Sequence, residues 1–398
     1  MRILINDHAG HPFQVQLSRS LALRGYQVLH TFTADLQTPR GALQKQSDDP
    51  ENFDITPISL SRPFERYGLV RRFMQEKELG RQLQAIVRRF KPDVVISANT
   101  PLGAQAMLLN ACISSGAGFG FWLQDLLGVG IRNNLKKKLP VLGDWIGQYY
   151  IAQENRLLKK SQAVVVITED FVPIVEKAGA EPSNIHVIHN WAPLHEVPVR
   201  DKHNDWSKSN GLGNTFNFIY SGTLGMKHNP EILVALAKTV KQFDHVRVVV
   251  ITEGLGAEYL AQQKARLGLD NLLLFAFQPF EQIPQVQATA DVLMAILEPD
   301  AGVFAVPSKV LTYLCAKRPL LLAIPLENLA ARTVERNNAG LLVSPHDMDG
   351  FAQAAIRLMQ DENLRRDMGA NGRNYAEKNF DIEIITDQFE KIFQEMML

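Results

Sequence analysis

A lysine beside a predicted helix start is the feature of this sequence that most directly suggests chemistry. In the stretch 300–314, Pro307 fits the first turn of a helix. Ser308 and Lys309 follow it, where backbone N–H groups have no partner inside the helix. A cation there is unfavourable, because the helix dipole already places positive charge at that end. A bound pyrophosphate would remove the conflict, so the stretch predicts a phosphate site; a solvated lysine is the alternative.

A second segment that could bind an anion follows another predicted strand, at residues 220–229 (YSGTLGMKHN). Gly222 and Gly225 allow a ligand to approach the backbone closely, and Lys227 supplies a positive charge just before a helix. A strand, a glycine turn and a lysine together favour phosphate binding. The spacing is not that of the P-loop GxxxxGK[ST], so the motif alone is weakly specific.

Two loops in the first half also follow predicted strands. Residues 6–13 (NDHAGHPF) contain Gly10, which permits close approach of a ligand, but they lack the GxGxxG of dinucleotide sites. His8 and His11 in this loop are expected to be solvated. Asp125, after the strand ending WLQ, could act as a base or orient a hydroxyl. Its alternative role is to cap the helix that follows.

A doubly wound parallel sheet would place all these loops at strand ends. Short apolar runs alternate with amphipathic helical stretches along both halves of the chain, from RILIND at 2–7 to AGLLVS at 339–344. This alternation predicts an α/β fold with two Rossmann-like halves in series. In such sheets ligands bind beyond the carboxyl ends of the strands, which is where these loops begin.

The length of the chain indicates two domains. Its 398 residues exceed what one hydrophobic core usually supports. Residues 192–214 are polar, contain Pro and Gly and show no periodicity, as expected of a connection between domains. We expect a first domain over 1–191, the connection at 192–214 and a second domain over 215–379. A terminal helix at about 380–398 could pack back on the first domain.

The net charge of zero conceals an uneven distribution. The chain has 42 Lys and Arg and 42 Asp and Glu. The first 190 residues contain 22 of the basic and 17 of the acidic residues, so their net charge is +5 and that of the remainder is −5. The neutral total argues against bulk binding to nucleic acid. Cys112 and Cys315 lie in apolar stretches and are expected to be buried free thiols.

A basic and aromatic stretch in the first half suggests contact with a membrane surface. Residues 62–72 (RPFERYGLVRR) interleave arginines with aromatic and aliphatic residues, as segments on anionic membranes do. A solvated helix face is the alternative. The start of the chain has no signal-peptide pattern, and no run of about 18 apolar residues occurs, so we expect a cytoplasmic protein. Peripheral contact with the inner face of the membrane would use Arg62, Arg66, Arg71 and Arg72.

The assembled segments resemble a family 4 glycosyltransferase of the GT-B fold, the retaining type that uses nucleotide sugars. The features occur in family order along nearly the whole chain: MRILIND, HPFQVQLSRSLALRGYQV, WLQD, VVVITEDF, HVIHNWAP, FIYSGTLGMKHN, VPSK, RPLLLA and AGLLV. The subgroup it is most similar to builds bacterial surface polysaccharides. The resemblance implies two Rossmann-like domains facing across a cleft. The second would bind the donor, and the first a hydroxyl of a glycan or lipid-linked acceptor. No metal or other cofactor is expected, because cationic side chains and dipoles can stabilise the leaving diphosphate.

The resemblance also implies roles for matching positions. Lys227 and Lys309 would contact the donor diphosphate, and Asp125 would lie near the transferred sugar as the catalytic carboxylate. Two positions depart from the family pattern: Thr312 replaces a glutamate that often holds the ribose hydroxyls, and Lys317 replaces a glycine. A threonine holds such a hydroxyl more weakly than a carboxylate does. The residues implied to bind the donor are Gly10, Gly222, Thr223, Lys227, Phe277, Gln278, Ser308, Lys309 and Thr312, with Phe277 and Gln278 at the base.

Two other functions fit the same residues. A nucleotide-sugar epimerase on this fold would act on the donor alone and need no acceptor. A non-catalytic GT-B scaffold or binding protein is suggested by the departures at Thr312 and Lys317.

Overall fold

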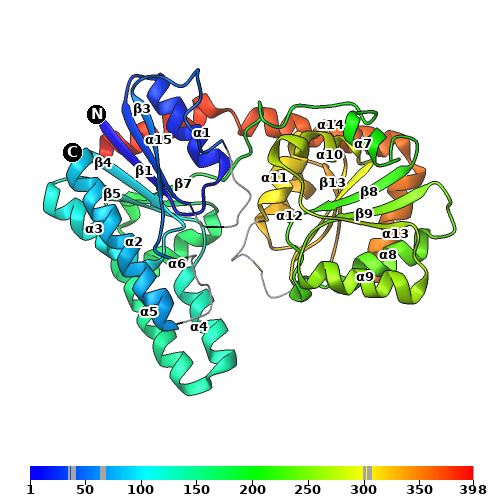
Figure 1. Cartoon of the computed structure of the whole chain (residues 1–398), viewed down its shortest axis with the longest axis horizontal. Coiled ribbons are helices and arrows are strands. Elements are labelled where there is room, and N and C mark those ends of the chain that lie inside the picture. Colours follow the sequence, from blue (N-terminus) through cyan, green and yellow to red (C-terminus); the bar gives the residue numbers. More distant parts are fainter. Residues whose placement is uncertain (35, 37–41, 63–68, 299–301, 303–306, 398) are drawn as a thin grey trace. The chain divides into compact units, whose positions relative to one another are not determined.

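The computed structural model describes residues 1–34, 36, 42–62, 69–298, 302 and 307–397 (Figure 1). Within these ranges, only the backbone is described for residues 69, 70, 134, 138 and 227. The chain divides into two compact units. The first comprises Met1–Asn190 together with Ile382–Leu398, and the second comprises Trp191–Asp381.

The first unit is built on a seven-stranded parallel sheet with strand order β3-β2-β1-β4-β5-β6-β7. Its middle strands are buried along most of their length, which explains why they read as unbroken apolar runs. Strand order reverses between β1 and β4, where Ile3 pairs with Val28 on one side and Val94 on the other. The strands are β1 (Arg2–Asp7), β2 (Gln27–Thr33), β3 (Phe53–Ile58), β4 (Val94–Ala98), β5 (Gly118–Leu123), β6 (Ala163–Val166) and β7 (Ile185–Val187).

The helices of this unit include the last helix of the chain, α15 (Ile382–Glu395), which packs on α1 (Pro12–Leu23). Arg24, just after α1, forms ion pairs with Asp387 (2.5 Å) and Glu390 (2.6 Å) of α15. The ring of Phe389 in α15 packs against that of Trp122, with ring centroids 4.8 Å apart. The other helices are α2 (Leu69–Phe90), α3 (Leu102–Ser115), α4 (Leu127–Lys138), α5 (Pro140–Lys160), α6 (Val172–Lys177) and the short η1 (Glu169–Phe171) and η2 (Pro182–Asn184). Among the described residues, no helix combines the length and apolarity that a bilayer span requires.

The second unit repeats the architecture with a six-stranded parallel sheet, in the order β10-β9-β8-β11-β12-β13. Here strand order reverses between β8 and β11. The strands are β8 (Phe216–Ser221), β9 (Val246–Ile251), β10 (Leu272–Phe275), β11 (Val292–Ile296), β12 (Leu320–Ala323) and β13 (Gly340–Val343). The helices are α7 (Asp205–Ser209), α8 (Glu231–Val240), α9 (Leu255–Leu267), α10 (Ile283–Thr289), α11 (Ser308–Cys315), α12 (Leu329–Arg336), α13 (Met348–Gln360), α14 (Glu362–Asn379), η3 (Met226–His228) and η4 (Phe280–Gln282).

The polar stretch expected to be an irregular connection contains one helix, α7. A capping box begins it: the Asn204 side chain accepts from the Ser207 N–H, and the Ser207 hydroxyl accepts from the Asn204 N–H, both at 3.0 Å. Trp206 within it is buried. A helix of five residues is too short to show a 3.6-residue period, so the pattern could not reveal it.

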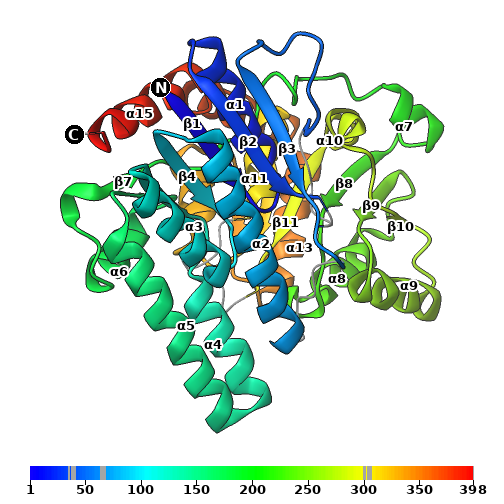
Figure 2. The same cartoon turned by 60° about the vertical axis from the view of Figure 1, so that its left-hand side comes forward.

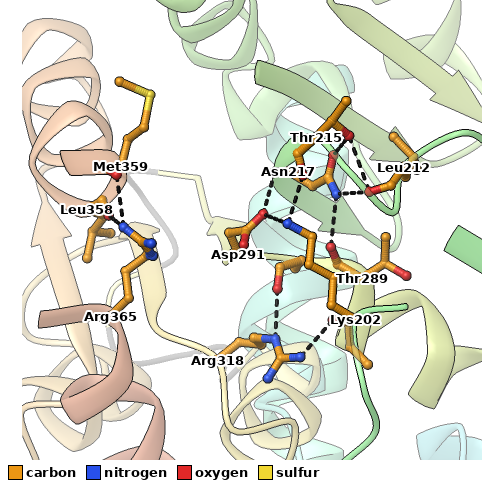
Figure 3. A network of polar contacts seen from close by, with 12 residues as sticks. Lys202, Leu212, Thr215, Asn217, Thr289, Asp291, Arg318, Leu358, Met359 and Arg365 are labelled. Carbon is orange, nitrogen blue, oxygen red and sulfur yellow. Dashed lines mark hydrogen bonds and ion pairs between the residues drawn. The ribbon is translucent and has the colours of Figure 1, made fainter. Parts of the chain in front are cut away.

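A polar network fastens this stretch to the second sheet (Figure 3). The Asp291 carboxylate, before β11, accepts from the Lys202 ammonium (2.5 Å) and from the Asn217 N–H (2.8 Å). The Asn217 amide donates in turn to the carbonyls of Leu212 (2.8 Å) and Thr289 (3.0 Å). One carboxylate therefore joins the connection, β8 and β11.

Replacing Asp291 by Ala should lower the free energy of unfolding by about 1.5–3 kcal/mol, because two donors lose a charged acceptor. Urea unfolding monitored on the second unit's transition measures this. Asp244→Ala is the matched control: Asp244 is exposed on the same unit and its carboxylate binds no described residue. The control should change stability by less than about 0.5 kcal/mol. Equal effects of the two substitutions would contradict the role given to Asp291.

Candidate functional site

Two of the predicted loops meet at the point where strand order reverses in the second unit. The turn containing Gly222 follows β8, and the segment leading to α11 follows β11. Lys309 lies in the first turn of α11 and reaches the β8 turn: its Nζ lies 3.8 Å from the centre of the Tyr220 ring. The structure thus brings Gly222 and Lys309 together, at the place where open α/β sheets bind ligands.

Glycine at position 222 is favoured by the backbone conformation of the turn. Its φ of +134° is a conformation that other residues rarely adopt. A Cβ built on it would also lie 3.0 Å from both Cε and Nζ of Lys309. A side chain at position 222 would therefore displace the end of the Lys309 side chain, which lies against the turn.

Two buried tyrosines fix this turn, and sequence analysis missed both. Tyr220 donates its hydroxyl hydrogen to the Thr223 carbonyl (2.7 Å). The Tyr313 hydroxyl, from α11, accepts from the Ser221 N–H (2.9 Å) and donates to the Ser221 carbonyl (3.1 Å). A tyrosine in an otherwise apolar buried strand or helix was the available signal, since a buried hydroxyl needs a partner. The turn is consequently held in place without any ligand.

The electrostatics at Lys309 favour an anion. Burial lowers the pKa of Lys309 to about 7. The first turn of α11 contains no acidic residue, and Lys309 forms no ion pair with a described residue. A negative ligand would restore the charge of this lysine and satisfy the helix N-terminus. Pro307 itself is the N-cap residue of α11 rather than part of its first turn, and the exposed Ser308 begins the helix.

Thr312 is already engaged in hydrogen bonds. Its hydroxyl donates to the Lys309 carbonyl (3.0 Å) and accepts from the Gln287 side-chain amide (2.9 Å). The buried Oε1 of Gln287 has no hydrogen-bond partner among the described residues. A ligand hydroxyl could reach only the remaining lone pair of Thr312, which makes this position a weak ribose contact.

The two residues assigned to the base lie just after β10 and differ in availability. Phe277 is 47% exposed, and its N–H donates to the Glu253 carboxylate (3.0 Å). The Gln278 amide is occupied, since its Oε1 accepts from the Trp206 indole (2.9 Å) and its Nε2 donates to the Ala276 carbonyl (2.9 Å). The Phe277 ring is therefore free to stack on a base, whereas Gln278 is held by the helix α7.

Thr223 and Lys227 belong to the same turn as Gly222. Thr223 is exposed, and Lys227 lies in η3. The Gly225 N–H donates to Nδ1 of His228 (2.9 Å), which closes the turn. The side chain of Lys227 lies outside the part of the chain that the structure describes.

In the first unit, a buried carboxylate shapes the loop that contains Gly10. Asp7, at the end of β1, accepts from the N–H groups of Ala9 (3.0 Å) and His11. Burial raises the pKa of Asp7, while the His11 charge and the loop N–H groups oppose that rise. Gly10 has a φ of +77°, so this tight turn also needs glycine. Sequence analysis missed Asp7, although an aspartate ending a buried strand before a glycine loop was the available signal.

The prediction that His8 is a solvated loop residue is wrong. The side chain is buried, and its Nδ1 lies 2.7 Å from the Thr33 hydroxyl. Burial lowers the pKa of His8 to about 3, so the ring is neutral and structural. His11 is half-buried, and its ring stacks on that of Phe13 with centroids 5.5 Å apart.

Asp125 lies in the loop between β5 and α4 and does not cap the helix. The N-cap residue of α4 is Leu126, and the Asp125 carboxylate accepts no hydrogen bond from a described residue. The carboxylate is open to solvent on one side, but protein crowds its other sides, and this desolvation raises its pKa against the opposing charge of His11. The start of α4 is held instead by buried Glu154 of α5, which accepts from the Gly128 N–H (3.1 Å).

Known protein families match both units. A model described as "Glycosyl transferase 4-like domain" matches residues 11–191, and one described as "Glycosyl transferases group 1" matches residues 202–375. This chain is a family 4 glycosyltransferase. The resemblance and the predicted fold class are confirmed: two Rossmann-like α/β units of the GT-B fold.

Relatives of this glycosyltransferase are distant. The putative colanic acid biosynthesis glycosyl transferase WcaI of Escherichia coli K12 is 23% identical over 319 residues, which cover 76% of this chain and 74% of WcaI. The structure of Anabaena Alr3699/HepE in complex with UDP and glucose has a TM-score of 0.72 at 18% identity, with 99% of each chain covered. A putative UDP-N-acetylglucosamine 2-epimerase from Listeria monocytogenes has a TM-score of 0.63 at 13% identity, with 99% of this chain and 97% of that chain covered. This chain therefore shares its fold with a protein described as a putative epimerase as well.

Proposed function

We propose that this glycosyltransferase moves a sugar from a nucleotide-diphosphate sugar to a hydroxyl of a glycan or lipid-linked acceptor in polysaccharide biosynthesis. Lys309 is the observation that carries the proposal. It is a basic side chain at a helix N-terminus, in contact with a glycine turn and without an ion pair among the described residues. A diphosphate has the charge and the acceptor oxygens that such a site needs. The UDP bound in HepE and the colanic acid pathway in the name of WcaI support this choice of donor and product.

In the proposed reaction, the bond between the anomeric carbon and the diphosphate oxygen breaks, and a bond to the acceptor oxygen forms. Lys309 and the N–H groups at the start of α11 stabilise the charge that develops on the leaving diphosphate. Asp125 accepts the acceptor proton or orients a sugar hydroxyl. We propose that the configuration at the anomeric carbon is retained and that no metal ion takes part.

The lowered pKa of Lys309 predicts that donor binding takes up a proton. In the free protein this amine loses its proton as the pH rises through about 7. A bound diphosphate favours the charged form and raises the pKa, so affinity should fall as the pH rises above 7. Calorimetry at pH 8, in buffers of different ionisation enthalpy, measures the uptake directly. If the wild type takes up no proton, or if Lys309→Met takes up as many protons as the wild type, Lys309 is not the group that binds the proton.

The assay of the proposed function separates it from its alternatives. Purified full-length protein is incubated with labelled UDP- and GDP-sugars, with and without lipid-linked saccharide acceptors. Release of the nucleoside diphosphate only when an acceptor is present is the expected result, and the anomeric coupling constant of the product tests retention. Isomerised sugar without an acceptor would identify an epimerase, an alternative that the likeness to the Listeria protein keeps relevant. If neither transfer nor isomerisation occurs with any donor, that result would favour a binding protein.

We also propose that the acceptor is presented on an anionic membrane at the cytoplasmic face. The four arginines first assigned to this contact are not equally suited to it. Arg62 and Arg71 are exposed, but Arg72 forms an ion pair with the buried Glu76 (2.9 Å). Arg66 lies outside the described residues. Charges on this stretch can therefore assist the contact, but a stronger membrane-binding surface would have to lie elsewhere.

A further inference from the structure

The helices α4 and α5 form a hairpin whose outer end lies away from the strands of the first unit. Figures 1 and 2 both show the pair extending beyond the sheet, with the turn between the helices at its far end. Pro140 begins α5 directly after Leu139, so the turn is short. The hairpin is a separate feature from the candidate site described above, apart from the first turn of α4.

Small residues line the inner side of this hairpin. A Cβ on Gly143 would lie 2.3 Å from the Leu135 carbonyl oxygen, and a Cβ on Gly147 would lie 2.5 Å from Cβ of Arg132. These two glycines are four residues apart, so they share one face of α5 and let the helices pack closely. An ion pair between Arg132 and Asp144 (2.9 Å) joins the helices beside them. Near the turn, the hairpin is consequently packed through its glycines, and the buried Tyr150 lies farther along α5.

Five large apolar side chains near the turn face solvent. Val141 and Trp145 are each 75% exposed, and Leu142 and Tyr149 are each 59% exposed. Val141, Trp145 and Tyr149 are spaced four residues apart and so share the outer face of α5. We call these four residues with the exposed Leu139 the apolar tip. Contiguous exposed apolar residues of this size mark a surface that binds something.

The charge beside the apolar tip indicates what it binds. Residues 132–149, around the turn of the hairpin, contain four Lys and Arg and one Asp, a net charge of +3. This is more than half of the excess of +5 in the first 190 residues. The basic residues of α5 itself lie toward its opposite end. Lys136 and Lys137 are exposed near the end of α4, next to the tip. An anionic partner complements this charge, whereas a second copy of the hairpin would bring two charges of +3 together.

We propose that the apolar tip inserts into the interfacial region of an anionic lipid bilayer. Tryptophan and tyrosine favour the depth of the lipid headgroups, and aliphatic side chains beside them reach the acyl chains. Lysines on the flank can extend their amines to the headgroup phosphates while their stems cover apolar surface. The inference rests on the proposed function for its biological purpose, since a lipid-linked acceptor lies in such a bilayer.

The chain carries its own probe for the test. Of its four tryptophans, Trp122, Trp191 and Trp206 are buried, and only Trp145 is exposed. Vesicles of phosphatidylcholine with phosphatidylglycerol, added to the full chain, should shift its emission to shorter wavelength. Brominated lipids should quench that emission, and vesicles of phosphatidylcholine alone should have a much weaker effect. Trp145→Phe should abolish the shift, because no other exposed indole remains.

Co-sedimentation with the same vesicles tests the residues of the surface. Val141→Ser with Leu142→Ser should lower binding at least tenfold, and Lys136→Gln with Lys137→Gln by roughly fivefold for each lysine. Leu255→Ser, which alters a 69% exposed leucine on α9, is the matched control and should bind as the wild type does. Transfer to a water-soluble acceptor should be unchanged in every variant, which separates this inference from the proposed function. Unchanged vesicle binding in both hairpin variants, or a tip-dependent dimer in sedimentation without any vesicle binding, would overturn the proposal.

Discussion

Replacing Asp125 by Asn should lower the rate of sugar transfer by roughly 10²- to 10⁴-fold, the range lost with a general base. Asparagine keeps the shape of the side chain but neither accepts a proton nor carries charge. Since the Asp125 carboxylate caps no helix and binds no described residue, the substitution should leave stability unchanged. Nucleotide affinity should also be unchanged, because the donor diphosphate is assigned to Lys309 in the other unit. Initial rates at saturating donor and acceptor measure the effect.

Asp54→Asn serves as the control for this prediction. Asp54 is an exposed aspartate of β3 in the same unit, outside the loops assigned to substrates. Its substitution should leave the rate within a factor of two. A wild-type rate for Asp125→Asn would remove Asp125 from catalysis and leave the first unit with Gly10 as its only proposed substrate contact.

Replacing Lys309 by Met should weaken nucleotide binding by about 1.5–3 kcal/mol, or roughly 10- to 150-fold, the contribution of a charged hydrogen bond. Methionine keeps an unbranched apolar stem against the Tyr220 ring, so the turn at Gly222 should stay in place. Activity should fall further than binding, since the lysine also stabilises the charge on the departing diphosphate. Calorimetry gives the first effect and saturating-donor rates give the second.

Lys238→Met is the matched control for this substitution. Lys238 is an exposed lysine of α8 on the same unit. Its replacement by Met should change neither the nucleotide affinity nor the transfer rate. Equal nucleotide affinities of Lys309→Met and the wild type would show that the diphosphate binds elsewhere, whatever the activity of the variant.

The fold and the location of the loops could be predicted from the sequence, because both depend on local patterns. Apolar strands alternating with amphipathic helices indicate a parallel sheet, and such a sheet sends its loops to one edge. The segments around Gly10, Gly222 and Lys309 were found in this way. That the Gly222 and Lys309 segments serve one ligand was implied by the family resemblance; the reversal of strand order between β8 and β11 that brings them together is seen only in the structure.

The partners of the supporting side chains could not be predicted, because these contacts join residues far apart in the chain. Tyr313 hydrogen-bonds the backbone of Ser221 across 92 positions, and Trp206 binds Gln278 across 72. Hydrophobic periodicity gives the face of an element but not its partner. His8 shows the same limit: its polar neighbours suggest solvent, but the packing of β2 buries it against Thr33.

The hairpin shows how a summed charge can obscure a local feature. The excess of +5 in the first half was evident from composition, and the run LKKKL at 135–139 is part of it, but neither shows that lysines flank an exposed apolar surface. Val141, Leu142 and Trp145 would normally be assigned to a core. Their exposure becomes clear only when Gly143 and Gly147 are seen to occupy the inner face of the helix.

Calorimetric titration of the full-length protein with UDP and GDP tests the central claim most directly, namely that the turn at Gly222 and Lys309 binds a donor diphosphate. The account predicts that at least one of the two nucleotides binds with one site per chain, and that Lys309→Met lowers its affinity at least tenfold. Absence of binding by both nucleotides, or binding that Lys309→Met leaves unchanged, would contradict it.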